Sequence, residues 1–227
     1  MEAGANGQPK SMNAPTGLLL DAMGTLIGLR RSVGSLYAEV AADHGLDLEP
    51  EALDGAFAEA YRSAPPLAFP AVSTAHLEQA ERHWWQQRIE ATFQAAGVNP
   101  LPIGLGGDLF DLFATTEPWD VYPEVPAALA RWREQGLRLA VVSNFDRRLH
   151  GLLEGLGLKE LVDTVLVSSE AGSAKPEPKL LQLALEQLEL SPDQAWHIGD
   201  SRADEEAASA AGLRCIRLQR PRGILVH

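Results

Sequence analysis

The stretch LLLDAMGTL, residues 18–26, decides the expected fold of this chain, because it joins an apolar run to an acid and a turn. Its three leucines predict a short buried strand, and Asp21 stands at the carboxyl end of that strand. Three later stretches also place a polar side chain where an apolar run stops and the chain turns: VVSN at 141–144, KPEP at 175–178 and HIGDSRAD at 197–204. In an open parallel sheet such ends share one edge, where ligands bind. The sequence therefore predicts one pocket formed by the side chains at these ends: Asp21, Ser143, Lys175 and Asp200.

The second half of the chain alternates between helix and strand patterns after Trp119. Expected strands cover 137–142, 162–167, 195–198 and 213–218, and expected helices cover 125–135, 147–156, 178–188 and 202–211. Strands separated by helical crossovers indicate a parallel sheet with helices on both faces. The strand before Asp21 is assigned to the same sheet because its acid completes the pocket. The expected fold class is therefore α/β, with a Rossmann-like parallel-sheet core.

The segment between these two parts has helical periodicity instead. After Pro50, apolar residues follow the i, i+3, i+4, i+7, i+8 spacing of an amphipathic helix: Leu53, Ala56, Phe57, Ala60 and Tyr61. Three further helices are expected within 36–45, 74–96 and 105–113. The predicted domains are a flexible tail at 1–15, an α/β core of 16–28 and 118–227, and a helical cap inserted at 29–117.

Composition and charge limit the partners. The formal net charge of −12 argues against nucleic-acid binding, because phosphates would be repelled, but it permits a small phosphorylated substrate or a protein partner. No apolar run reaches the roughly 20 residues that span a bilayer, and residues 1–15 lack the apolar segment of a secretory signal. Cys215 is the only cysteine and is expected to pack as a small core residue. We therefore expect a cytoplasmic protein without a membrane partner.

The polar residues at the strand ends suit phosphoryl transfer. A carboxylate such as Asp21 can attack phosphorus or carbon and form a covalent intermediate that water resolves. The Ser143 hydroxyl, with Asn144 beside it, can hold phosphate oxygens. Lys175 would keep the Asp21 carboxylate ionised and compensate the charge of the substrate. Each residue alone has a plain structural alternative, such as a capping carboxylate or a solvated lysine, and only the combination favours catalysis.

The acid pair Asp200 and Asp204 offers the hard oxygen ligands that Mg²⁺ prefers, so Mg²⁺ is the predicted cofactor. Asp204 can alternatively cap the helix that follows it, and Asp146 is interpreted as the N-cap of the helix at 147–156. His197 is interpreted as a packed strand residue, since imidazole is a poor magnesium ligand.

The order of acid, serine, lysine and acid pair resembles the haloacid dehalogenase-like hydrolase superfamily, over nearly all of residues 16–220. The resemblance implies a type-one helical cap and a phosphatase-type reaction through an aspartyl-phosphate, with Asp21 as the nucleophile. The implied metal ligands are Asp21, the Met23 carbonyl and Asp200, with support from Asp204. The implied contacts with the transferred group and the substrate are Ser143, Asn144, Lys175 and Thr25.

Met23 departs from the phosphatases of this superfamily, which place an aspartate two residues after the nucleophile. That aspartate protonates the leaving group and then activates water, whereas a methionine cannot move a proton. The loss is worth on the order of 10²–10⁴ in rate. Dehalogenases of the superfamily also have a non-acid at this position, but they use no metal and usually lack the acid that corresponds to Asp200.

Three functions remain open from the sequence. The first is Mg²⁺-dependent hydrolysis of a small phosphorylated metabolite with weakened acid/base catalysis. The second is a binding or regulatory protein on a catalytically impaired hydrolase fold, and the third is metal-independent cleavage of a carbon–halogen bond. The cap residues that face the site are undecided among Arg30, Arg31, Tyr37, Tyr61, Arg62 and Trp84.

Overall fold

The computed structural model describes residues 14–220, so nearly all of the predicted tail at 1–15 lies outside the described residues. Its centre is a five-stranded sheet in the order β5-β4-β1-β6-β7. Every pair is parallel, and Leu19 of β1 lies opposite Ala140 of β4 and His197 of β6. The predicted parallel α/β sheet is confirmed. Its strands are β1 Gly17–Leu20, β4 Arg138–Ser143, β5 Thr164–Val167, β6 Ala195–Gly199 and β7 Arg214–Arg217.

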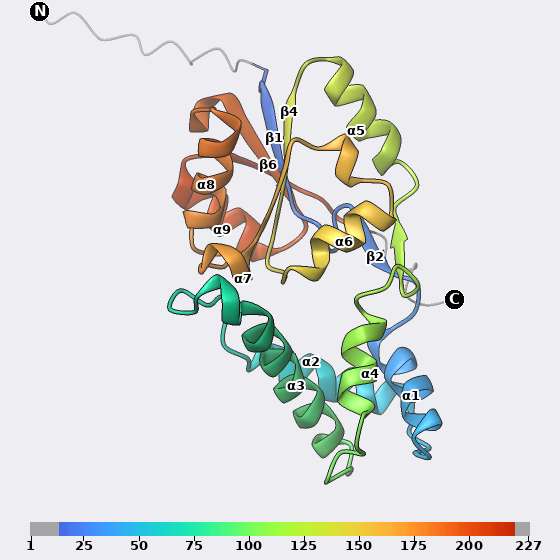
Figure 1. Cartoon of the computed structure of the whole chain (residues 1–227). Coiled ribbons are helices and arrows are strands. Elements are labelled where there is room, and N and C mark those ends of the chain that lie inside the picture. The colour runs from blue at the N-terminus through green and yellow to red at the C-terminus, as the bar shows by residue number, and fades with distance from the viewer. Residues whose placement is uncertain (1–13, 221–227) are drawn as a thin grey trace, which may run out of the picture.

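Successive side chains of β1 point to opposite faces of the sheet, as the pleat of a strand requires. Leu18 and Leu20 pack with helices α5 and α6, while Leu19 packs with α8 and α9. Figure 1 shows these two helix layers on either side of the sheet. Because both faces are covered, β1 reads as an unbroken apolar run rather than an alternating one. The helices are α5 Val125–Glu134, α6 Arg148–Gly155, α8 Lys179–Leu188 and α9 Arg202–Ala211.

The chain between β2 and β3, residues 30–118, contains four longer helices and is called the helical insert below. Its helices are α1 Val33–Asp43, α2 Pro50–Arg62, α3 Leu77–Ala95 and α4 Leu105–Leu112. They pack around their own apolar cluster, which includes Tyr37, Leu53, Phe93 and Leu109. Figure 1 places the insert beyond one end of the sheet.

Short elements account for the differences from the prediction. β2 (Ile27–Leu29) and β3 (Trp119–Val121) pair antiparallel outside the main sheet and connect the insert to the core. Three residues are too few to show the alternation that marks a strand. The expected helix at 74–96 begins as a 3-10 turn, Thr74–His76, before α3. The remaining short helical segments are α7 Ser168–Ala171 and the 3-10 turns Lys159–Leu161 and Pro192–Gln194.

Within residues 14–220, no helix combines the length and the apolar character needed to cross a membrane. Cys215 packs against the apolar cluster around Leu19, as expected, but it is only half-buried because it lies in β7, the strand at the edge of the sheet. Burial still raises the pKa of its thiol to about 11, so the thiol stays protonated at neutral pH.

Candidate active site

Asp21 lies just beyond the carboxyl end of β1, and the residue is 6% exposed. Its backbone N–H donates to the Ile198 carbonyl (2.9 Å), which holds the residue against β6. Its Oδ1 atom accepts a hydrogen bond from the Ser143 hydroxyl (3.1 Å) and another from the Lys175 ammonium (2.7 Å). Ser143 is the last residue of β4, the strand beside β1. The three side chains therefore meet at the carboxyl end of the sheet, as expected.

Lys175 is fixed through both its ammonium and its backbone. Besides Asp21, the ammonium donates to Asp204 Oδ1 (2.6 Å) and to the Val142 carbonyl (3.0 Å). The side-chain amide of Asn144 pairs with the backbone N–H and carbonyl of Lys175, at 2.8 Å each. Burial would lower the pKa of Lys175, but the charges of Asp21 and Asp204 raise it, so the side chain is an ammonium. Both polar atoms of the Asn144 side chain are thus bonded to the Lys175 backbone. The predicted contact between Asn144 and a substrate stays a prediction.

Asp204 is 1% exposed and accepts hydrogen bonds at both carboxylate oxygens. Oδ1 accepts from Lys175 and from His197 Nε2 (2.9 Å), and Oδ2 accepts from the N–H (3.0 Å) and hydroxyl (2.6 Å) of Ser201. Burial would raise the pKa of Asp204, but the hydrogen bond from His197 and the charge of Lys175 hold it well below its usual range. Ser201 is the N-cap of α9, so Asp204 takes part in the helix cap as well as in this cluster. His197 is fully enclosed, which confirms its interpretation as a packed strand residue.

A third acid completes the cluster. Asp21, Asp200 and Asp204 offer carboxylate oxygens that lie within 4.8 Å of one another. Gly24 permits this approach, because it has a φ of +79° and a Cβ there would come 2.3 Å from Asp200 Oδ2. Burial raises the pKa of Asp200, and the charges of Asp21 and Asp204 raise it further. Carboxylate oxygens are the hard ligands that Mg²⁺ prefers, so this group of acids fits Mg²⁺.

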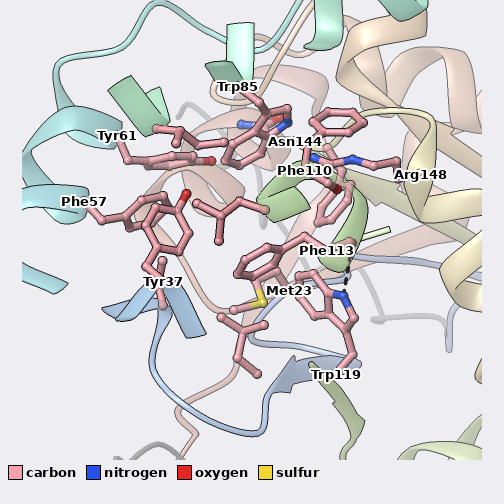
Figure 2. A pocket seen from close by; sticks show the side chains of 15 residues that line it. Met23, Tyr37, Phe57, Tyr61, Trp85, Phe110, Phe113, Trp119, Asn144 and Arg148 are labelled. Carbon is pink, nitrogen blue, oxygen red and sulfur yellow. Dashed lines mark hydrogen bonds between the residues drawn. The ribbon is translucent and has the colours of Figure 1, made fainter. Parts of the chain in front are cut away.

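Met23 and Thr25, in the turn that follows Asp21, differ in how accessible their side chains are. The Met23 side chain is 38% exposed and lines an apolar cavity (Figure 2). The Thr25 hydroxyl oxygen is enclosed and has no hydrogen-bond partner among the described residues. Contact between Thr25 and a substrate would need this hydroxyl to become accessible, and it stays a prediction, as does metal binding by the Met23 carbonyl.

The apolar cavity has a volume of about 260 Å³ and lies between the core and the helical insert. Aromatic rings dominate its lining, and Trp119 and Phe145 of the core face it. The remaining aromatic lining residues belong to the insert: Tyr37, Phe57, Tyr61, Trp85, Phe110 and Phe113. Figure 2 shows several of these rings directed toward a common interior, with Met23 at one side.

Arg148 also lines the cavity, and its charge is balanced locally. Its Nε and Nη2 atoms donate to the two oxygens of Asp146 (2.8 and 2.7 Å), and Nη1 donates to the Phe110 carbonyl (3.0 Å). Trp85 Nε1 donates to the same carboxylate (2.6 Å). Asp146 was expected to cap the helix at 147–156; it accepts from the Arg148 N–H (3.0 Å), but Arg147 is the N-cap of α6. Its carboxylate mainly fixes Arg148 and Trp85.

Sequence reasoning identified part of this cavity. Of the six undecided residues, Tyr37 and Tyr61 line it, whereas Trp84 donates to the Pro65 carbonyl (3.0 Å) outside the lining. The arginines form ion pairs elsewhere, Arg30 with Asp120, Arg31 with Glu39 and Arg62 with Glu59. The lining residues Phe57, Phe110, Phe113 and Trp119 were missed. Apolar periodicity predicts which side of a helix is buried, but not whether it faces a packed core or a cavity.

A cluster of carboxylates around a lysine lies at the carboxyl ends of parallel strands, which is where α/β enzymes place their active sites. The comparison with protein families is more specific, because the family described as haloacid dehalogenase-like hydrolase matches residues 16–212. The chain therefore belongs to the haloacid dehalogenase-like hydrolases, and the resemblance drawn from the four stretches is confirmed.

Individual proteins agree with this assignment. Haloacid dehalogenase-like hydrolase domain-containing protein 3 of Homo sapiens is 38% identical over 210 residues, covering 91% of this chain and 83% of its own length. L-2-haloacid dehalogenase from Xanthobacter autotrophicus, with chloropropionic acid covalently bound, has a TM-score of 0.67 at 19% identity, covering 92% and 80% of the two chains. CbbY from Rhodobacter sphaeroides, in complex with phosphate, has a TM-score of 0.61 at 22% identity, covering 94% and 89%. At these identities the two structures show the shared fold.

Proposed function

We propose that this protein is a Mg²⁺-dependent hydrolase of the phosphatase type that acts on a small phosphorylated substrate. The observation that carries the proposal is the meeting of Asp21, Asp200 and Asp204 within 4.8 Å of one another, with Lys175 bonded to two of them. Such a cluster supplies a nucleophile together with positions for a cation and an anionic group. The phosphate complex of CbbY supports a phosphorylated ligand at this fold.

Asp21 is the proposed nucleophile. Attack by its carboxylate on phosphorus forms an O–P bond while the bond to the leaving oxygen breaks, which gives an aspartyl-phosphate. Water then attacks the phosphorus, releases inorganic phosphate and restores the carboxylate. Lys175 and Ser143, which already contact Asp21 Oδ1, are placed to hold the oxygens of the transferred group.

Asp21, Asp200 and the Met23 carbonyl are the groups that would hold Mg²⁺. Asp204 engages both its oxygens with Lys175, His197 and Ser201, so we propose that it supports the site by fixing Lys175. The bound cation would balance the negative charge of the acids and of the phosphoryl group.

Met23 leaves the site without an acid two residues after the nucleophile. The leaving oxygen then receives no proton from this turn, and departure depends on how stable the leaving anion is. We therefore propose slow turnover that is fastest for esters of acidic alcohols and phenols, with a rate deficit on the order of 10²–10⁴.

The helical insert is the proposed cap, which corresponds to the predicted domain at 29–117 on a core of 16–28 and 118–227. Buried Glu81 of the insert accepts from the N–H (3.2 Å) and Nε (3.1 Å) of Arg147 in the core. The Ser168 hydroxyl of the core donates to the Leu67 carbonyl of the insert (2.6 Å). These contacts hold the insert beside the acid cluster, where a cap would exclude water from the reacting group.

Phosphate release from a panel of esters, with and without Mg²⁺, tests the proposal. Release should require Mg²⁺ and should disappear in Asp21→Asn. Asp120→Asn is a matched control, because this exposed acid is paired with Arg30 at the surface. Folded protein that releases no phosphate from any ester in the presence of Mg²⁺ would contradict the proposal.

Two outcomes separate the alternatives. Halide release from 2-haloacids that resists a chelator would favour a dehalogenase; Met23 and the apolar cavity are compatible with that activity, and the retained Asp200 argues against it. A biological role that survives Asp21→Asn would favour a binding or regulatory protein with a protein partner.

A further inference from the structure

The apolar cavity bears on the chemistry of the leaving group, an argument that rests on the function proposed above. Met23 and Asn144 both line the cavity. Met23 follows Asp21 by two residues, and Asn144 holds the backbone of Lys175. A phosphoryl group attacked by Asp21 would therefore direct its leaving group toward the cavity.

Among the described residues that line the cavity, none offers an unbalanced charge. Arg148 is engaged by Asp146 through two nitrogens and by the Phe110 carbonyl through the third. Its guanidinium also lies 3.9 Å from the centroid of the Phe110 ring and 5.1 Å from that of Trp85. A second anionic group on a substrate would lose its water here without gaining a counter-charge, which is unfavourable.

Two tyrosines line the cavity, Tyr37 and Tyr61, and the Tyr37 hydroxyl is the better candidate to bind a ligand because Tyr61 is 44% exposed. Tyr37 is 2% exposed, with its ring stacked on Phe93 (centroids 5.8 Å apart) and in edge contact with Phe57 (5.7 Å). Figure 2 shows its hydroxyl directed into the cavity, where no other described residue forms a hydrogen bond with it. Burial raises the pKa of Tyr37, so the hydroxyl keeps its proton and can donate. Within the cavity this hydroxyl can donate a hydrogen bond to water or to an acceptor atom of a bound ligand.

We propose that the substrate is a phosphate ester whose leaving group is uncharged and aromatic, or similarly apolar, with an acceptor atom that meets the Tyr37 hydroxyl. The surrounding rings favour a flat apolar group, because aromatic side chains pack well against one another. The absence of a free counter-charge in the described lining disfavours leaving groups that carry a carboxylate or a second phosphate.

An isosteric pair of esters tests the charge argument. 4-Carbamoylphenyl phosphate and 4-carboxyphenyl phosphate have nearly the same shape and differ in the charge of one group. We expect kcat/KM to be at least about ten-fold higher for the carbamoyl ester. Equal values, or a preference for the carboxylate, would overturn the inference while leaving the phosphatase proposal in place.

Binding of the parent phenols separates this inference from the proposed function. Quenching of tryptophan fluorescence by 4-hydroxybenzamide and by 4-hydroxybenzoate measures occupancy without turnover, since Trp85 and Trp119 line the cavity. Preferential binding of the amide supports the inference even if no ester is hydrolysed. Failure of both phenols to bind, together with normal hydrolysis of small charged esters, would contradict the inference.

Two variants test the named residues. Asp146→Asn removes the counter-charge of Arg148. The ratio of kcat/KM for the carbamoyl ester to kcat/KM for the carboxy ester should therefore fall at least about five-fold. An unchanged ratio in folded protein contradicts the charge argument. Tyr37→Phe should weaken binding of at least one of 2-, 3- and 4-hydroxybenzamide by about three- to ten-fold relative to phenol, which lacks the amide acceptor. Equal effects on all four ligands would overturn the hydrogen bond. If either variant fails to fold, the isosteric esters on the unaltered protein still test the charge argument.

Discussion

The acid cluster, formed by Asp21, Asp200 and Asp204 with Lys175, adjoins the apolar cavity. The two regions differ in how their charges are balanced. In the cluster, the Lys175 ammonium contacts two carboxylates, and a third lies nearby. In the cavity, the guanidinium of Arg148 is balanced by Asp146, and rings supply most of the lining. We infer that the transferred group is bound through charge and the leaving group through shape and apolar contact. Met23 lies at the boundary, where an acid would extend the charged region.

The largest expected effect comes from removing the nucleophile. Asp21→Asn keeps the size of the side chain but abolishes its nucleophilic charge, so kcat should fall on the order of 10⁴-fold or more. Steady-state phosphate release measures the loss, and circular dichroism verifies the fold. Activity within ten-fold of the unaltered protein would mean that another group forms the covalent bond.

Met23→Asp should sharpen the comparison by bringing an acid to the boundary. We expect a gain in phosphatase turnover, within the range of about 10²–10⁴ that general acid catalysis provides. The gain should be greatest for esters of weakly acidic alcohols, which most need a proton on the leaving oxygen. A series of phenyl and alkyl phosphates measures it.

Met23→Leu is the matched control, because leucine is also apolar and cannot move a proton. An unchanged rate in Met23→Asp across the whole series would mean either that another side chain already supplies the proton or that the remaining site is not competent.

Gly24→Ala should damage the cluster and leave the cavity intact. The new Cβ would come 2.3 Å from Asp200 Oδ2, and the φ of +79° adds strain of about 1–2 kcal/mol. Gly45→Ala is the control, because it has a φ of +77° and no atom within 4 Å of the new Cβ. Both variants should lose stability in denaturant, but only Gly24→Ala should also lose stabilisation by added Mg²⁺. Equal responses to Mg²⁺ would contradict a role for Asp200 in metal binding.

The two regions also differ in how far the sequence predicts them. Asp21, Ser143 and Asp200 were predicted to meet because each stands at or just after the carboxyl end of a strand, and a parallel sheet brings these ends together. Lys175 differs, because it lies eight residues after β5 and beyond α7, so its expected place at the end of an apolar run was wrong. The hydrogen bonds within the cluster were not predicted. Asn144 holding the Lys175 backbone, and His197 holding Asp204, depend on side-chain directions that motif spacing does not specify.

The cavity was largely beyond sequence reasoning. Its lining combines residues from distant parts of the chain, such as Met23, Trp85 and Trp119, and their meeting depends on how the helical insert rests on the core. Asp146 illustrates the difficulty, because its position before α6 suggests a cap whereas its carboxylate contacts Trp85 more than 60 residues away in sequence. Helical periodicity contains no information about such contacts between separate elements.

Two adjacent tryptophans give the smallest and most selective test of the comparison. Trp85 lines the cavity and donates to buried Asp146, whereas Trp84 donates to the Pro65 carbonyl outside the lining. Replacing either with phenylalanine removes one hydrogen bond and should reduce the free energy of unfolding by about 1–2 kcal/mol. Only Trp85→Phe should also raise KM, by roughly three- to ten-fold, because it alters the surface that we assign to the leaving group. Chemical denaturation and steady-state kinetics on the same preparations measure both quantities, and a rise in KM of the same size in Trp84→Phe would show that the effect spreads through α3 rather than arising in the cavity.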